Sequence, residues 1–125
     1  MIGNERRGEI EIKSASCTLA QMSFAEFQQS VARDSAPPAD ASSALQALWH
    51  SAGQQNAASW ELAHRLVQDD SSRDGAWVHA YLHRKEGDTG NAGYWYARAR
   101  RPLPAEGVTL EAEWAEIARA LLGEK

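Results

Sequence analysis

The sequence contains a single cysteine, Cys17, among its 125 residues. A lone cysteine excludes an intramolecular disulfide framework and a zinc site built from cysteines. No apolar run approaches the roughly 20 residues that a helix needs to cross a bilayer, so we expect no membrane span. The N-terminal segment is charged throughout and has no apolar signal-peptide core, which favours a cytoplasmic location.

Positive charge is also scarce, with 13 Lys and Arg against 17 Asp and Glu and a net charge of −4. Nucleic-acid affinity comes largely from the neutralisation of phosphates, so this balance excludes a generally basic nucleic-acid binder. The phosphate-binding loop, the nucleophile elbow and the dinucleotide fingerprint are all missing. No nucleophile, base and orienting group can be assembled from the motifs present. We therefore expect a protein that is not an enzyme and has no cofactor.

Residues 1–21 differ in character from the rest of the chain. Ile10 and Ile12 alternate with charged residues, which favours one short strand, but a single strand cannot form a sheet alone. We expect residues 1–21 to form a flexible tail and residues 22–125 to form a single domain. The alternative is that this strand adds to the edge of a partner's sheet.

From Ser23 onward the periodicity and the capping signals predict an all-α domain. Ser23 and Glu26 have the spacing of a capping box at the start of the first helix. Proline and glycine separate the segments, because neither favours the interior of a helix. The expected helices cover about Phe24–Val31, Ser42–Ala52, Asn56–Gln68, Arg73–Glu86, Gly90–Arg101 and Leu110–Leu121.

A self-match appears when the chain is shifted by 34 residues, which places Gly53 on Gly87 and Leu48 on Leu82. The second unit has small and aromatic residues at fixed offsets, namely Gly87, Ala92, Tyr96, Ala99 and Pro104. This pattern resembles the second half of a tetratricopeptide repeat (TPR), which also has a 34-residue period. The segment from Ala76 to Pro104 also resembles small bacterial helical proteins. The resemblance implies about two TPR-like helical hairpins with Leu110–Leu121 as a capping helix, while the register of the first hairpin stays open.

The resemblance also implies a binding face. Trp77, Tyr81, Arg84 and Lys85 form a stripe along one helix, and the corresponding face lines the concave groove of TPR arrays, where peptides bind. Tryptophan, tyrosine and arginine dominate binding hot spots. We therefore expect a protein–protein interaction module that binds a peptide or protein segment. Two alternatives remain: the aromatic residues belong to the core, or the exposed faces form a homodimer.

His79 and His83 form the second candidate site. They are four residues apart, so both imidazoles lie on one face of a helix, a spacing that is compatible with a metal ion. Zinc would need a third ligand, and the sequence places none. The leading interpretation is therefore two buried, hydrogen-bonded histidines without a metal. The alternative function is a small-ligand or metal-binding protein that uses this pair and the neighbouring aromatic residues.

Overall fold

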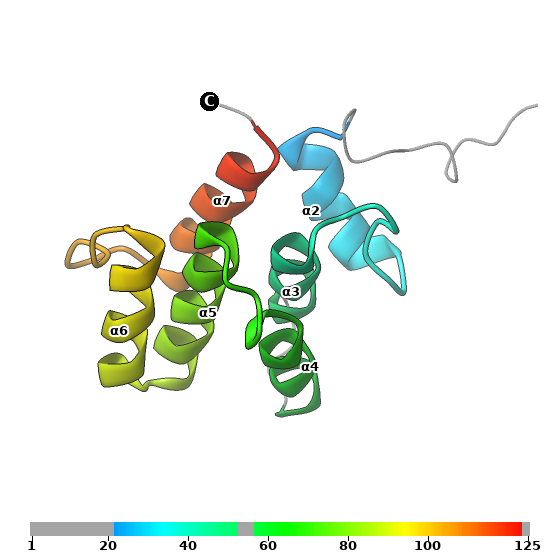
Figure 1. Ribbon diagram of the computed structural model, residues 1–125. Helices are drawn as coiled ribbons and strands as arrows, with labels where there is room; N and C mark the ends of the chain where they lie inside the picture. Colours follow the sequence, from blue (N-terminus) through cyan, green and yellow to red (C-terminus); the bar gives the residue numbers. More distant parts are fainter. Residues whose placement is uncertain (1–21, 53–56, 124–125) are drawn as a thin grey trace, which may run out of the picture.

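Six helices follow one another in the part of the chain that the structure describes, residues 22–52 and 57–123 (Figure 1). The structure is a computed structural model. It contains no strand among these residues, which confirms the all-α prediction. The expected tail and Cys17 lie outside the described residues. The helices are α2 (Phe24–Arg33), α3 (Ser43–Ser51), α4 (Ala57–Val67), α5 (Arg73–Glu86), α6 (Thr89–Ala99) and α7 (Leu110–Leu121).

Local chemical signals set the ends of these helices. Ser23 and Glu26 form the expected capping box, in which each side chain accepts a hydrogen bond from the backbone N–H of the other, at 3.2 and 2.9 Å. Helix α5 ends at Gly87, whose φ of 90° lies in the left-handed region that favours glycine. Further N-caps accept hydrogen bonds through the side chains of Ser42, Ser72, Asp88 and Thr109.

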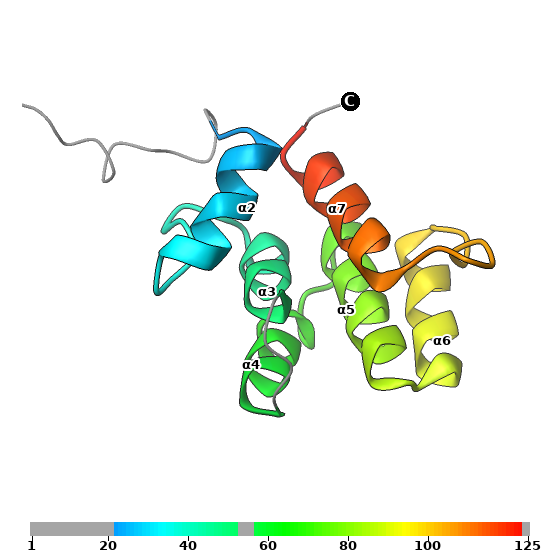
Figure 2. The same cartoon turned by 180° about the vertical axis from the view of Figure 1, so that it is seen from behind.

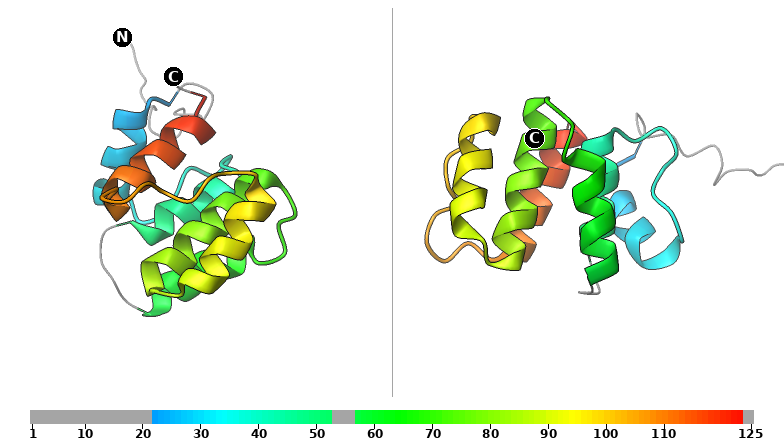
Figure 3. Two further views of the ribbon diagram at one scale, coloured as in Figure 1. Left: turned by 90° about the vertical axis from the view of Figure 1, so that its left-hand side faces the viewer. Right: turned by 60° about the horizontal axis from the view of Figure 1, so that its bottom comes forward.

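Four of the helices form two antiparallel pairs, and α5, a member of the second pair, is the central helix. Helix α3 packs along α4, and α5 packs along α6 (Figure 1). Helix α5 also contacts α3, α4 and α7, and α7 reaches α2 (Figure 2). The right-hand view of Figure 3 shows α6, α5 and α4 side by side, with α7 behind α5. Every residue from Gly75 to His83 is buried as a result. Within the described residues, no helix is long and apolar enough to span a membrane.

Tryptophan side chains join distant segments of this core. The indole N–H of Trp114 in α7 donates to the backbone oxygen of Leu48 in α3, at 2.8 Å. The indole of Trp114 also stacks on the Phe27 ring of α2, with 5.7 Å between centroids. A buried tryptophan needs a partner for its N–H, so each such bond fixes one helix against another. Trp114 therefore fixes the position of α7 against α2 and α3.

A buried polar network joins α5, α6 and α7. The carboxylate of Glu113 is almost fully buried, accepts a hydrogen bond from the Arg84 guanidinium at 2.8 Å, and accepts one from the Tyr96 hydroxyl at 2.5 Å. Arg84 also donates to the backbone oxygen of Val108. Burial, followed by the hydrogen bond with Glu113, raises the pKa of Tyr96. The phenol therefore stays protonated, and it satisfies the buried carboxylate.

Candidate functional site

The two aromatic residues of the expected peptide-binding face are buried. Trp77 and Tyr81 are 3% and 2% exposed. The guanidinium of Arg101 lies 3.8 Å from the centre of the Trp77 ring and covers it. The sequence left open the alternative that these two aromatic residues belong to the core. Their burial in the structure agrees with that alternative. Trp77 offers no surface to a partner in this conformation.

The two basic residues of that face are engaged within the chain. Arg84 pairs with the buried carboxylate of Glu113, and Lys85 donates to the backbone oxygen of Ser51. Burial lowers the pKa of Lys85, and the nearby carboxylate of Glu111 partly opposes this shift. Tyr81 and Lys85 still line a pocket of about 350 Å³ between α2, α5 and α7, whereas Trp77 and Arg84 do not.

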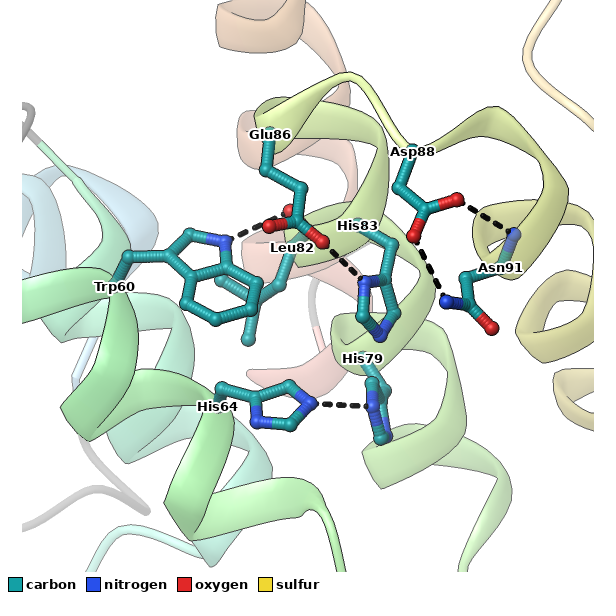
Figure 4. A network of polar contacts seen from close by, with 8 residues as sticks. All are labelled: Trp60, His64, His79, Leu82, His83, Glu86, Asp88 and Asn91. Atoms are coloured by element: carbon teal, nitrogen blue, oxygen red, sulfur yellow. Dashed lines mark hydrogen bonds and ion pairs between the residues drawn. The ribbon is translucent and has the colours of Figure 1, made fainter. Parts of the chain in front are cut away.

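On the other side of α5, three histidine side chains lie close together. His79 and His83 of α5 face His64 of α4 across the two hairpins (Figure 4). One ring nitrogen from each residue lies within 4.8 Å of the other two. The Nε2 atoms of His64 and His79 are 3.0 Å apart. Helices α4 and α5 therefore place three imidazole rings close together.

Glu86 fixes the orientation of the His83 ring. The carboxylate of Glu86 lies 2.7 Å from the Nδ1 atom of His83, so Nδ1 carries the proton and donates to it (Figure 4). The lone pair of a neutral His83 is then on Nε2. Metal-binding histidines commonly donate their second N–H to a carboxylate in this way. Glu86 is thus placed as an orienting residue for His83.

Aromatic rings enclose the histidine cluster. The Trp95 indole of α6 stacks on His79 with 3.9 Å between centroids, and the Trp60 indole of α4 stacks on His64 at 4.8 Å. The N–H of Trp60 donates to the backbone oxygen of Leu82 at 2.9 Å, which anchors that ring (Figure 4). The imidazoles therefore stand in a rigid, mostly apolar surrounding.

This surrounding keeps two of the imidazoles neutral near pH 7. Burial, with the charges of His64 and His83, lowers the pKa of His79 to about 4. Burial and then His83 also lower the pKa of His64, while Glu86 and Glu61 act in the opposite direction. A neutral imidazole is the form that binds a metal ion, because its lone pair is free.

The cluster is not satisfied by its own hydrogen bonds. The Nδ1 atom of His79 is buried and has no hydrogen-bond partner among the described residues. A neutral imidazole has one donor and one acceptor, and an unpaired buried one costs about 1–3 kcal/mol. The interpretation of two hydrogen-bonded core histidines therefore accounts for His83 but only partly for His79.

The separations of the ring nitrogens suit a first-row transition metal. Zinc–nitrogen bonds of roughly 2.0–2.1 Å at tetrahedral angles place two ligand nitrogens about 3.4 Å apart. The His64 and His79 nitrogens, at 3.0 Å, are already close to this spacing. The third nitrogen lies within 4.8 Å, so a bound ion would draw His83 slightly inward.

A second group with possible metal ligands, formed by His83, Glu86 and Asp88, has other roles. Glu86 accepts from His83, and Asp88 accepts from the backbone and side-chain N–H groups of Asn91 at 3.2 and 2.8 Å. Asp88 is the N-cap of α6. The hydrogen bonds from Asn91 lower the pKa of Asp88, which keeps it ionised for this capping role. The three-histidine set is therefore the better candidate.

Sequence reasoning identified His79 and His83 but missed His64. His64 lies 15 residues before His79, and no short motif connects them. The available signal was a second pair at the same four-residue spacing, Trp60 and His64, on the preceding helix. A short turn at Asp69–Ser72 makes the two helices neighbours, which could have placed the pairs together.

No protein-family model, curated protein or solved structure matches the chain. The TPR resemblance therefore rests on the residue pattern alone. The candidate site likewise stands on its own geometry.

Proposed function

We propose that this protein binds a divalent first-row transition metal ion, with zinc as the first candidate, through His64, His79 and His83. The observation behind the proposal is that three histidine nitrogens from two hairpins lie within 4.8 Å of one another. This corresponds to the alternative that the sequence left open, now with the third ligand that it lacked. Imidazole nitrogen is a ligand suited to zinc, copper, nickel and iron.

Two properties of the site support this function over a purely structural cluster. Burial lowers the pKa of His64 and of His79, so both imidazoles are neutral near pH 7, the form that binds a metal ion. Glu86 orients His83 with its Nε2 lone pair free, as an outer-shell carboxylate does in many metal sites.

The bound ion would link the two hairpins. His64 belongs to α4, whereas His79 and His83 belong to α5. An ion that binds the folded chain and not the unfolded chain stabilises the folded state by mass action. Three protein ligands also leave a fourth tetrahedral position for water or another small ligand. We keep the expectation that the protein is not an enzyme as a prediction.

Isothermal titration of the full chain with zinc tests the proposal. We expect one ion per chain for the native protein. Each of the variants His64→Gln, His79→Gln and His83→Gln should lose at least about tenfold in affinity, in line with the loss of one ligand. His50→Gln is the matched control, because His50 lies on α3 outside the cluster. Equal affinity in the native chain and the three variants would rule out the site.

The interaction role and the TPR-like arrangement stay predictions. The arrangement is supported by the pairing of α3 with α4 and α5 with α6, and by the burial of Ala92, Tyr96 and Ala99 of the repeat pattern. A pull-down with a Lys85→Gln bait tests whether that face captures a protein or peptide segment. Loss of capture relative to the native chain would support the role.

A further inference from the structure

A second site lies on the opposite side of α5 from the histidines. Tyr81 and Lys85 alternate along the helix with His79 and His83, so the two pairs point in opposite directions. Tyr81 and Lys85 line the pocket of about 350 Å³ between α2, α5 and α7. Pockets that hold small molecules span roughly 300–1,000 Å³. The volume is therefore sufficient for a small ligand.

The pocket contains hydrogen-bonding capacity that the fold leaves unused. The Tyr81 side chain is almost fully buried, yet its hydroxyl makes no hydrogen bond with any other described residue. A tyrosine hydroxyl is neutral at pH 7 and can donate a hydrogen bond. Lys85 uses one of its three ammonium donors on the backbone oxygen of Ser51. Both residues can therefore donate to an anionic group.

The remaining surfaces of the pocket restrict the ligand further. Glu111 at the rim supplies a negative charge and accepts hydrogen bonds. The indole of Trp114 and the side chains of Leu110 and Val31 supply apolar walls. A ligand that matches all of these has a carboxylate, a cationic group and an apolar body. An anion alone would meet the negative charge of Glu111.

We propose that this pocket binds an α-amino acid with a large apolar side chain, in its zwitterionic form. The Lys85 ammonium and the Tyr81 hydroxyl hold the carboxylate, Glu111 receives the ammonium, and the side chain lies against Trp114. The proposal goes beyond the metal site and does not depend on it. It takes up Tyr81 and Lys85 but leaves Trp77 and Arg84 to the core.

Titration calorimetry with four related probes tests the proposal, with the native full chain as the protein. The probes are L-phenylalanine, phenethylamine, 3-phenylpropionate and N-acetyl-L-phenylalanine. A chelator is present throughout, because amino acids also bind metal ions. We expect L-phenylalanine to bind at least about tenfold more tightly than each of the other three, since each lacks one charged group.

Matched variants locate the binding. Tyr81→Phe removes only the hydroxyl, and Glu111→Gln removes only the rim charge. Each should weaken phenylalanine binding by about fivefold or more, because hydrogen bonds to charged groups are the stronger ones. Glu116→Gln on the exposed side of α7 is the control and should bind like the native chain. Circular dichroism verifies that all variants remain helical.

Three results would overturn the proposal. The first is no binding of L-phenylalanine at millimolar concentration. The second is equal or tighter binding of N-acetyl-L-phenylalanine, which would assign the pocket to the carboxyl end of a peptide. The third is binding that Tyr81→Phe and Glu111→Gln leave unchanged, which would place the ligand elsewhere.

Discussion

At the scale of single residues, the two nitrogen atoms of the His79 ring have different surroundings. Its ring is stacked on Trp95, its Nε2 atom meets His64, and its Nδ1 atom has no partner in the described parts of the chain. His83 is the opposite case, because Glu86 satisfies its Nδ1 atom. The effect of each change near the cluster therefore depends on which ring nitrogen it touches.

Loss of the Glu86 carboxylate should weaken metal binding without removing a ligand. Glu86→Gln leaves a weaker acceptor for the His83 N–H, and outer-shell changes of this kind typically cost 10–100-fold in affinity. We expect a loss of about tenfold for zinc, measured by competition with a chromophoric chelator. Glu61→Gln is the control, because Glu61 influences His64 only through its charge. An unchanged affinity in Glu86→Gln would contradict the assigned role.

The buried imidazole also gives the metal-free protein a pH-dependent stability. The pKa of His79 falls from 6.5 to about 4 on folding. The unfolded chain therefore binds more protons between these values, and the free energy of unfolding decreases as the pH falls from 6.5 towards 4. A shift of this size corresponds to at most about 3 kcal/mol. Urea unfolding at pH 7 and pH 5 should show the loss, and His79→Gln should reduce it. An equal pH dependence in the two proteins would contradict this assignment.

At the scale of the helices, the backbone at Gly87 and Gly93 predicts opposite effects of one substitution. Neither position has an atom within 4 Å of an added Cβ. Gly87→Ala should destabilise by about 1 kcal/mol, because φ is +90° there. Gly93→Ala lies inside α6 and should stabilise by up to about 1 kcal/mol, because alanine is the better helix former. Thermal unfolding of both variants gives the two signs, and a Gly87→Ala variant as stable as the native chain would contradict the left-handed C-cap at Gly87.

The ion pair between Arg84 and Glu113 should behave as a fixed connection between α5 and α7. Arg84→Met leaves a carboxylate that is 3% exposed without its cation, which costs roughly 3 kcal/mol of unfolding free energy. The double variant Arg84→Met, Glu113→Gln should be more stable than Arg84→Met alone, because no buried charge remains unpaired. Urea unfolding of the native chain, Arg84→Met, Glu113→Gln and the double variant measures the coupling. If the loss of unfolding free energy in the double variant equals the sum of the losses in the two single variants, the two residues are not coupled.

The helices themselves could be predicted from the sequence because their signals are local. The capping box at Ser23, the glycine at Gly87 and the prolines after α6 act over a few residues, so the predicted and observed ends agree closely. The faces of α5 could not be predicted in this way. A stripe such as Trp77 and Tyr81 indicates an exposed or a buried face only when the neighbours are known, and four other helices surround α5.

At the scale of the whole molecule, the candidate site depends on how one hairpin packs against the other. The sequence supplied His79 and His83, which share one helix face, but His64 joins them only because α4 packs beside α5. The same packing separates the histidine cluster on one side of α5 from the pocket on the other. Long-range packing of this kind leaves no short motif in the sequence.

A crystal of the full chain grown with zinc tests the central claim most directly. Anomalous diffraction at the zinc edge locates the ion without reference to any assumed ligand. The account predicts one peak about 2.0–2.1 Å from a ring nitrogen of each of His64, His79 and His83. A histidine cluster without a peak in a crystal that holds zinc elsewhere would contradict it.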